Sequence, residues 1–118
     1  MKRLTTHVLD TASGKPGSNI RIELFSINKN KEKQLVKTLI TNADGRTDEP
    51  LLEGDTFSHG VWELRFHVGD YFSDSTRSKQ DSVAFLDEIP IVFGISDDSH
   101  YHVPLLASPW SYSTYRGS

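Results

Sequence analysis

The sequence predicts one all-β domain, a β-sandwich of immunoglobulin-like class with one short helix. Three observations lead to this prediction. About seven short segments alternate apolar and polar residues, clusters of turn-forming residues separate them at intervals of about 8 to 12 residues, and only one stretch has the character of a helix. A chain of 118 residues is long enough to bury a proper core without disulfides. We therefore expect residues 1–118 to form one domain.

The expected strands are recognised by a period of two, because successive side chains of a strand point to opposite faces of the sheet. In the clearest strand, Trp62, Leu64 and Phe66 share one face and charged residues the other, so we expect Trp62 in the core. In chain order, the expected strands cover residues 5–9, 20–27, 34–41, 61–68 and a segment that begins at 90, followed by a C-terminal hairpin within residues 100–118.

The connections between these strands are rich in residues that form turns and loops. Gly45 follows Asp44 in a strong turn signal, because glycine adopts the positive φ that tight turns require. The other connections are residues 10–17, which we expect to leave the sheet, a solvated lysine-rich loop at 28–33, an irregular stretch at 47–57 and a turn at 96–99.

The one expected helix covers residues 74–86. Asp74 or Ser75 could cap its first turn, and Val83, Phe85 and Leu86 supply a partial apolar stripe. Such a helix would have two or three turns at most.

Composition limits the classes of partner and the compartment. The net charge of −3 provides no basic field for nucleic acid or for an anionic membrane surface. No apolar run approaches the length of a signal peptide or the ~20 residues of a membrane span. The absence of cysteine excludes disulfides and thiolate metal sites. We therefore expect a cytoplasmic protein without nucleic acid or membrane as a partner.

The C-terminal segment carries the residues best suited to chemistry. His100 and His102 share one face of an extended strand, because they are two residues apart. Two neighbouring imidazoles suit proton transfer or metal binding. They are equally compatible with a structural role, as surface histidines on a hydrophobic hairpin. The spacing alone leaves both interpretations open.

This segment resembles the signature of the 5-hydroxyisourate hydrolases, the enzymatic members of the transthyretin-like family. The resemblance rests on His-Tyr-His-Val-Pro-Leu-Leu, on Ser-Pro-Trp-Ser-Tyr-Ser-Thr and above all on the closing Tyr-Arg-Gly-Ser. Thr-Thr-His-Val-Leu-Asp near the start, Asp-Gly-Arg, Gly-Asp-Tyr-Phe and Glu-Ile-Pro-Ile are similar to further landmarks of the family, so the likeness runs nearly end to end. Transthyretin itself lacks the closing tetrapeptide and has threonine where His102 stands. Ala107, where the family has leucine, is a small departure.

The resemblance implies a transthyretin-like sandwich of seven to eight strands that hydrolyses 5-hydroxyisourate to 2-oxo-4-hydroxy-4-carboxy-5-ureidoimidazoline in urate degradation. It implies no cofactor, and a homotetramer with active sites at a subunit interface. The catalytic residues implied are His7, Arg46 and His102. Substrate contacts are expected from His7, Arg46, His100, Tyr115 and Ser118, whose terminal carboxylate would lie close to the site. We expect His102 to act as the base and His7 as its partner.

Two alternatives belong to other classes. One is a transthyretin-like carrier of a small ligand, which would not require His102 or the closing tetrapeptide. The other is a zinc hydrolase with His7, His100 and His102 as ligands, although the nearby cation Arg46 would weaken metal binding. No Gly-x-Ser-x-Gly elbow supports a serine acyl-enzyme. His59 and His67 are expected to be structural.

Overall fold

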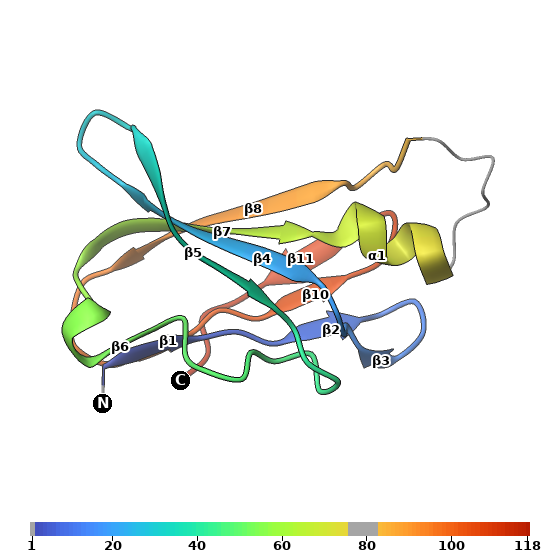
Figure 1. Cartoon of the computed structure of the whole chain (residues 1–118), viewed down its shortest axis with the longest axis horizontal. Helices are drawn as coiled ribbons and strands as arrows, with labels where there is room; N and C mark the ends of the chain where they lie inside the picture. Colours follow the sequence, from blue (N-terminus) through green and yellow to red (C-terminus); the bar gives the residue numbers. More distant parts are fainter. Residues whose placement is uncertain (1, 76–82) are drawn as a thin grey trace.

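The structure is a computed structural model that describes residues 2–75 and 83–118. Its strands form two layers (Figure 1). One layer is the sheet β5-β4-β7-β8, and the other combines the sheets β6-β1-β9 and β11-β10-β2-β3. The strands are β1 Arg3–Thr5, β2 Val8–Asp10, β3 Lys15–Pro16, β4 Arg21–Ile27, β5 Lys33–Ile40, β6 Leu52–Glu53, β7 Gly60–His67, β8 Glu88–Ile95, β9 His100–His102, β10 Leu105–Ala107 and β11 Tyr112–Thr114. A short 3₁₀ helix, η1, covers Gly54–Thr56, and the α-helix α1 covers Val68–Ser75.

The two layers enclose one hydrophobic core. Leu24, Leu64 and Phe66 of the first layer and Leu4 and Leu105 of the second are completely buried. The alternation in β7 is confirmed, because Trp62 is buried beside the core. The all-β sandwich is therefore confirmed, with one short α-helix among the described residues.

The charged face of β7 differs from a simple solvated face. Glu63 is fully buried, although its neighbours in sequence alternate as expected. Lys33 Nζ lies 2.8 Å from Glu63 Oε1, and Arg65 Nη2 lies 2.7 Å from Glu63 Oε2. Desolvation raises the pKa of the Glu63 carboxyl. The hydrogen bonds and charges of Lys33 and Arg65 outweigh this effect, so the pKa lies below its ordinary value. The carboxylate is tolerated at this depth because both of its oxygens face a cation.

The first expected strand, residues 5–9, is divided in the structure. β1 ends at Thr5 and β2 begins at Val8, so Thr6 and His7 lie between two strands that belong to different sheets. The segment that follows β9 stabilises this break. The Val103 N–H donates to the Thr5 carbonyl and the Leu105 N–H donates to the His7 carbonyl, each at 2.9 Å. Alternation in the sequence continues through the break, which is why the sequence did not reveal it.

The expected C-terminal hairpin is present as β10 and β11, and β9 does not belong to it. β9 pairs in parallel with β1, and β10 pairs in parallel with β2. Within residues 100–118, only β10 and β11 form a hairpin. Two expected loops contribute short strands as well, since β3 lies within residues 10–17 and β6 within residues 47–57. These strands of two residues are too short for a sequence pattern to detect.

The helix lies earlier than expected. α1 begins at Val68, directly after β7, and Phe72 packs one turn later into the same core. The Gly69 N–H donates to the Asp87 carbonyl at 2.9 Å, and a Cβ at Gly69 would stand 2.2 Å from Asp87 Oδ1. Most of the expected helix 74–86 lies outside the described residues, and its described end, residues 83–86, is not helical. Val68 extends the alternation of the strand, which concealed the helix start.

Gly45 has a positive φ of 75°, as the turn signal predicts. Its place in the fold imposes a second requirement. A Cβ on Gly45 would stand 2.4 Å from the Val8 carbonyl oxygen, and the Val8 N–H donates to the Gly45 carbonyl at 2.8 Å. This close approach fixes the turn that carries Arg46 against the start of β2.

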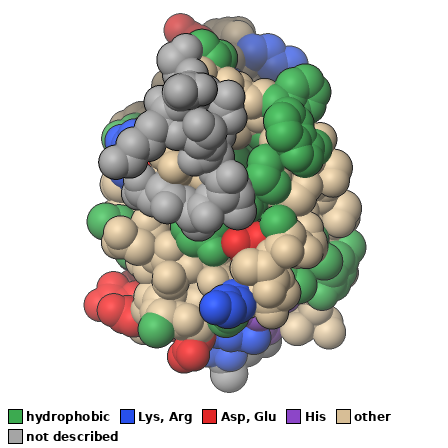
Figure 2. Space-filling view, turned by 90° about the vertical axis from the view of Figure 1, so that its right-hand side faces the viewer, with side chains coloured by type: hydrophobic (Ala, Val, Ile, Leu, Met, Phe, Trp, Pro, Cys, Tyr) green, Lys and Arg blue, Asp and Glu red, His purple; other side chains and the backbone are tan. Residues whose placement is uncertain are grey.

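The chain ends lie together at one end of the sandwich (Figure 1). At the opposite end, hydrophobic side chains gather on the surface (Figure 2). Exposed aromatic side chains include Phe85, after α1, and Trp110, after β10, whose ring centroids are 6.1 Å apart. Among the described residues, no helix has the length and apolar character needed to cross a membrane.

Candidate active site

The parallel pairing of β1 with β9 brings the candidate residues together. Arg3 stands opposite His100, and Thr5 stands opposite His102. Leu4 and Tyr101, between them, are buried in the core. The alternate residues of both strands therefore point to the other face, and the expectation that His100 and His102 share a face agrees with the register. Their ring centroids are 6.4 Å apart.

The Thr5 hydroxyl joins the two imidazoles. Thr5 Oγ1 lies 2.8 Å from His100 Nε2 and 2.9 Å from His102 Nδ1. A hydroxyl has one proton and two acceptor lone pairs, so it can donate to one of the two rings at most and must accept an N–H from any other ring it binds. The tautomers of the two histidines are therefore coupled through Thr5.

These side chains line a cleft of about 430 Å³. On one side lie β1 and β9, on another the segment that follows the Gly45 turn, and Ser118 contributes from the C-terminal segment. The lining residues are Arg3, Thr5, Thr6, Arg46, Thr47, Asp48, Glu49, Pro50, His100, His102 and Ser118. Four residues predicted from the sequence thus meet in one cleft, namely Arg46, His100, His102 and Ser118.

Arg46 is held at the cleft by a turn built on Asn42. The Asn42 side-chain oxygen accepts the backbone N–H groups of Asp44 at 2.9 Å and Arg46 at 3.2 Å. The Asn42 N–H in turn donates to the Arg46 carbonyl at 2.7 Å. The Arg46 side chain is exposed, and none of the ion pairs between described residues includes it. Its guanidinium is therefore available to a ligand.

His7 lies beside the cleft and does not line it within one chain. It sits in the break between β1 and β2, next to the turn of residues 42–46. Desolvation and the Arg46 guanidinium lower the pKa of His7, and a hydrogen bond to the Asp44 backbone opposes them. Desolvation, Arg46 and His100 lower the pKa of His102, and the charge of a protonated His7 lowers it further.

The three histidines share one electrostatic character. Desolvation is the main cause that lowers the pKa of His7, His100 and His102. Arg46 further lowers the pKa of His102, and Arg3 that of His100. All three rings are therefore predominantly neutral near pH 7, and a neutral imidazole can accept a proton.

The C-terminal segment meets the cleft at Gly117 and Ser118. The Gly117 N–H donates to the His102 carbonyl at 2.7 Å, in an isolated antiparallel bridge. A Cβ on Gly117 would stand 2.9 Å from His102 Cδ2, so a glycine is needed for this approach. The next residue, Ser118, then lines the cleft.

Tyr115 is not at this cleft within one chain. It lies at a second cavity of about 220 Å³, together with residues of β8 and with Tyr101 and Arg116, and its side chain is exposed. Its expected contact with substrate stays a prediction.

Sequence reasoning missed the two residues that stand opposite the histidines. Arg3 lies before the motif around His7, and Thr5 is the first residue of that motif. Neither was predicted as a site residue, because their relevance depends on the pairing with β9. The zinc alternative requires a convergent set of ligands. Among residues 2–75 and 83–118, no three His, Cys, Asp or Glu side chains are grouped so that they could hold a metal ion.

His59 and His67 lie away from the cleft. His67 Nε2 is 2.6 Å from Glu23 Oε1, and His59 Nε2 is 2.8 Å from Asp98 Oδ1. Both histidines thus have carboxylate partners of their own, in agreement with the structural roles expected for them.

Comparison with known proteins gives consistent results. A 5-hydroxyisourate hydrolase of Ralstonia nicotianae is 56% identical over 119 residues, with both chains covered completely. The solved structure of the 5-hydroxyisourate hydrolase of Klebsiella pneumoniae is 30% identical, with a TM-score of 0.80 and complete coverage of both chains. Sea bream transthyretin in complex with thyroxine is 25% identical, with a TM-score of 0.84 over 98% of this chain and 94% of its own. The family model described as HIUase/Transthyretin family matches residues 4–117, and the chain belongs to this family.

Proposed function

We propose that this protein hydrolyses 5-hydroxyisourate in urate degradation. The observation that carries the proposal is the hydrogen-bonded row His100–Thr5–His102 in a cleft that also receives Arg46. Relatives that are 56% and 55% identical over at least 98% of this chain are named 5-hydroxyisourate hydrolases. The fold alone does not separate the enzymes from the carriers, because transthyretin has an equally similar backbone. The residues of the cleft support the enzyme, and we expect it to act in the cytoplasm.

In the mechanism we propose, His102 takes a proton from water, and the water oxygen attacks the carbonyl carbon of the ring amide. Arg46 donates to the carbonyl oxygen, on which negative charge develops. His102 then returns the proton to the departing ring nitrogen as the C–N bond breaks. The carbonyl carbon becomes a carboxylic acid, which releases its remaining proton to solvent as it ionises to the carboxylate. His7, beside Arg46, acts as the partner of His102.

Thr5 gives this mechanism a testable detail. Replacing Thr5 by valine removes the hydroxyl and preserves the shape, so both ring nitrogens lose their shared partner. We expect kcat to fall about 10- to 100-fold, because the tautomer and orientation of His102 are no longer fixed. Thr5→Ser should restore most of the rate. An unchanged kcat in Thr5→Val would show that the bridge has no part in turnover.

The pH dependence follows from the lowered pKa of His102. A base must be unprotonated, so the rate should be constant above neutrality and fall as the pH drops below the ordinary histidine pKa of about 6.5. The protein should also lose stability in this range, because the unfolded chain binds protons more readily than the partly buried histidines of the folded protein do. We would measure kcat/KM and thermal unfolding from about pH 5 to pH 8. A rate that increased on acidification would contradict a neutral histidine base.

We also propose a homotetramer. β8 and β11 are the outer strands of their sheets, and exposed apolar side chains near these edges include Val92, Tyr112 and Tyr115. Unpaired strand edges with apolar side chains favour association with a second copy. In such an assembly Tyr115 could reach the cleft of a neighbouring subunit. Sedimentation equilibrium should give four times the chain mass of 13.3 kDa, and a monomer would overturn this arrangement.

The decisive experiment follows the decay of freshly generated 5-hydroxyisourate by ultraviolet absorbance. Urate and urate oxidase generate the substrate in the cuvette, because it decomposes spontaneously. The proposal predicts decay much faster than in a blank without the protein. Decay no faster than the blank, together with saturable binding of thyroxine, would favour a transthyretin-like carrier. Turnover that requires stoichiometric zinc, in protein purified without a metal-affinity column, would favour the zinc alternative.

A further inference from the structure

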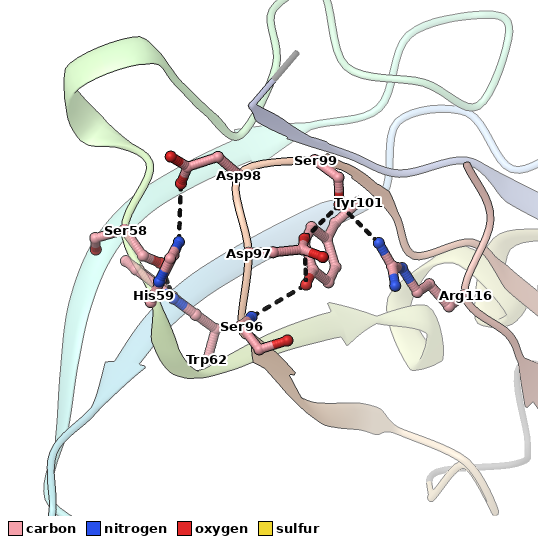
Figure 3. Close-up of polar contacts among 9 residues, drawn as sticks. All are labelled: Ser58, His59, Trp62, Ser96, Asp97, Asp98, Ser99, Tyr101 and Arg116. Atoms are coloured by element: carbon pink, nitrogen blue, oxygen red, sulfur yellow. Dashed lines mark hydrogen bonds and ion pairs between the residues drawn. The ribbon is translucent and has the colours of Figure 1, made fainter.

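Arg116 contacts the fold outside the cleft, at the turn between β8 and β9 (Figure 3). Its guanidinium carbon lies 4.0 Å from the centroid of the Tyr101 ring, and Arg116 Nη2 donates to Ser99 Oγ at 2.9 Å. Stacking and hydrogen bonding therefore hold the same guanidinium. Arg116 does not line the cleft that contains His102.

The residues that receive Arg116 are themselves fixed. The Tyr101 hydroxyl accepts the Ser96 N–H at 3.0 Å and donates to Asp97 Oδ1 at 3.1 Å. The Ser99 hydroxyl donates to the same Asp97 oxygen (Figure 3). Tyr101 lies between His100 and His102 in β9, and its ring is buried on the opposite face of the strand. The contact surface of Arg116 is thus part of the strand that carries both histidines.

The segment after β11, residues 115–118, has few other attachments in the described structure. Its one ladder contact is the bridge between Gly117 and His102, and Tyr115 is exposed. Arg116 directly precedes that bridge, and Ser118 directly follows it at the cleft. Among the contacts of the described residues, the hydrogen bond from the Gly117 N–H to the His102 carbonyl is the main polar attachment of this segment besides those of Arg116.

We propose that Arg116 is a positioning residue for the hydrolysis proposed above, on which this inference rests. It anchors residues 115–118 to Tyr101 and Ser99, so that Gly117 lies against the His102 ring and Ser118 completes the wall of the cleft. The anchor acts through Gly117 and makes no contact with substrate. A displacement of catalytic or binding groups by about 1 Å can lower the reaction rate by a large factor. Loss of the Arg116 anchor therefore affects the reaction although Arg116 lies outside the cleft.

The test compares Arg116→Ala, Arg116→Lys and Asp98→Asn in the full chain. Arg116→Ala should lower kcat/KM about tenfold, and Arg116→Lys should recover part of it, because lysine keeps a cation over Tyr101 and a donor for Ser99. Asp98→Asn is the matched control. It weakens the pair between Asp98 Oδ1 and His59 Nε2 at the same turn, 2.8 Å apart, and should leave kcat/KM unchanged.

Two measurements separate positioning from a general loss of structure. A chain that ends at Gly117 should lose activity as Arg116→Ala does, and the two changes together should be no worse than either alone. Amide exchange of Gly117 should become faster in Arg116→Ala and stay slow in Asp98→Asn, whether or not the protein hydrolyses 5-hydroxyisourate. Wild-type kcat/KM, or unchanged Gly117 exchange, in Arg116→Ala would overturn the inference. An inactive wild-type protein with the expected exchange would overturn the proposed function and retain the anchor.

Discussion

Replacing His102 by asparagine is expected to lower kcat for 5-hydroxyisourate by on the order of 10²- to 10⁴-fold. Asparagine retains the approximate size of the ring and a side-chain hydrogen bond to Thr5, and it cannot accept a proton from water near pH 7. His102 lines the cleft, and desolvation and Arg46 lower the pKa of its ring. The measurement is the initial rate of substrate decay at saturating substrate, with the spontaneous decay subtracted.

The matched control is His59→Asn. His59 is exposed, and it pairs with Asp98, which lies in the turn before β9. His59→Asn therefore makes the same replacement of a histidine by asparagine at a position away from the cleft. His59→Asn should retain the wild-type kcat. If His102→Asn also kept the wild-type rate, His102 could not be the base, and His7 would be the next candidate.

Replacing Arg46 by alanine is expected to lower kcat/KM by about 10²- to 10³-fold. The guanidinium is the one donor group of the Gly45 turn that lines the cleft, and it would face the oxygen on which charge develops. Arg46→Lys should recover little, because an ammonium group lacks the planar pair of donors. The pH profile gives a second readout. The acid limb of kcat/KM should move to higher pH in Arg46→Ala, since the guanidinium lowers the pKa of His102.

Arg21→Ala provides the control for a lost guanidinium. Arg21 is exposed on β4, and its Nη2 lies 3.3 Å from His67 Nδ1, away from the cleft. Its replacement should leave both kcat/KM and the acid limb unchanged. An acid limb that stayed in place in Arg46→Ala would contradict the electrostatic contact between Arg46 and His102.

Much of the fold and part of the site could be predicted because they depend on local periodicity. The alternation of apolar and polar residues predicted that Trp62 lies in the core and that His100 and His102 share one face of their strand, and the structure agrees. The Asp-Gly pair identified the turn before Arg46, since only glycine adopts its positive φ without strain. Nearest-neighbour geometry decides these features, so the sequence displays them directly.

The sequence also showed the limits of periodicity. Val68 continues the alternation of β7, yet it starts α1, because Phe72 can then reach the core one turn later. Over the few residues around Val68, the same apolar positions fit both the period of a strand and the period of a helix. Tertiary contacts, including the one between Gly69 and Asp87, decide between them.

The assembly of the site was decided by the tertiary structure alone. Thr5 and His102 are 97 residues apart in the chain, and only the parallel register of β1 and β9 places the hydroxyl against both imidazoles. The break at His7 and the anchor of Arg116 on Tyr101 depend likewise on segments that are remote in sequence. Residue types and spacing within one strand therefore determined which groups could act. Pairing between distant strands determined which of them meet, because a sequence pattern records the direction of a side chain and carries no information about its partner across the sheet.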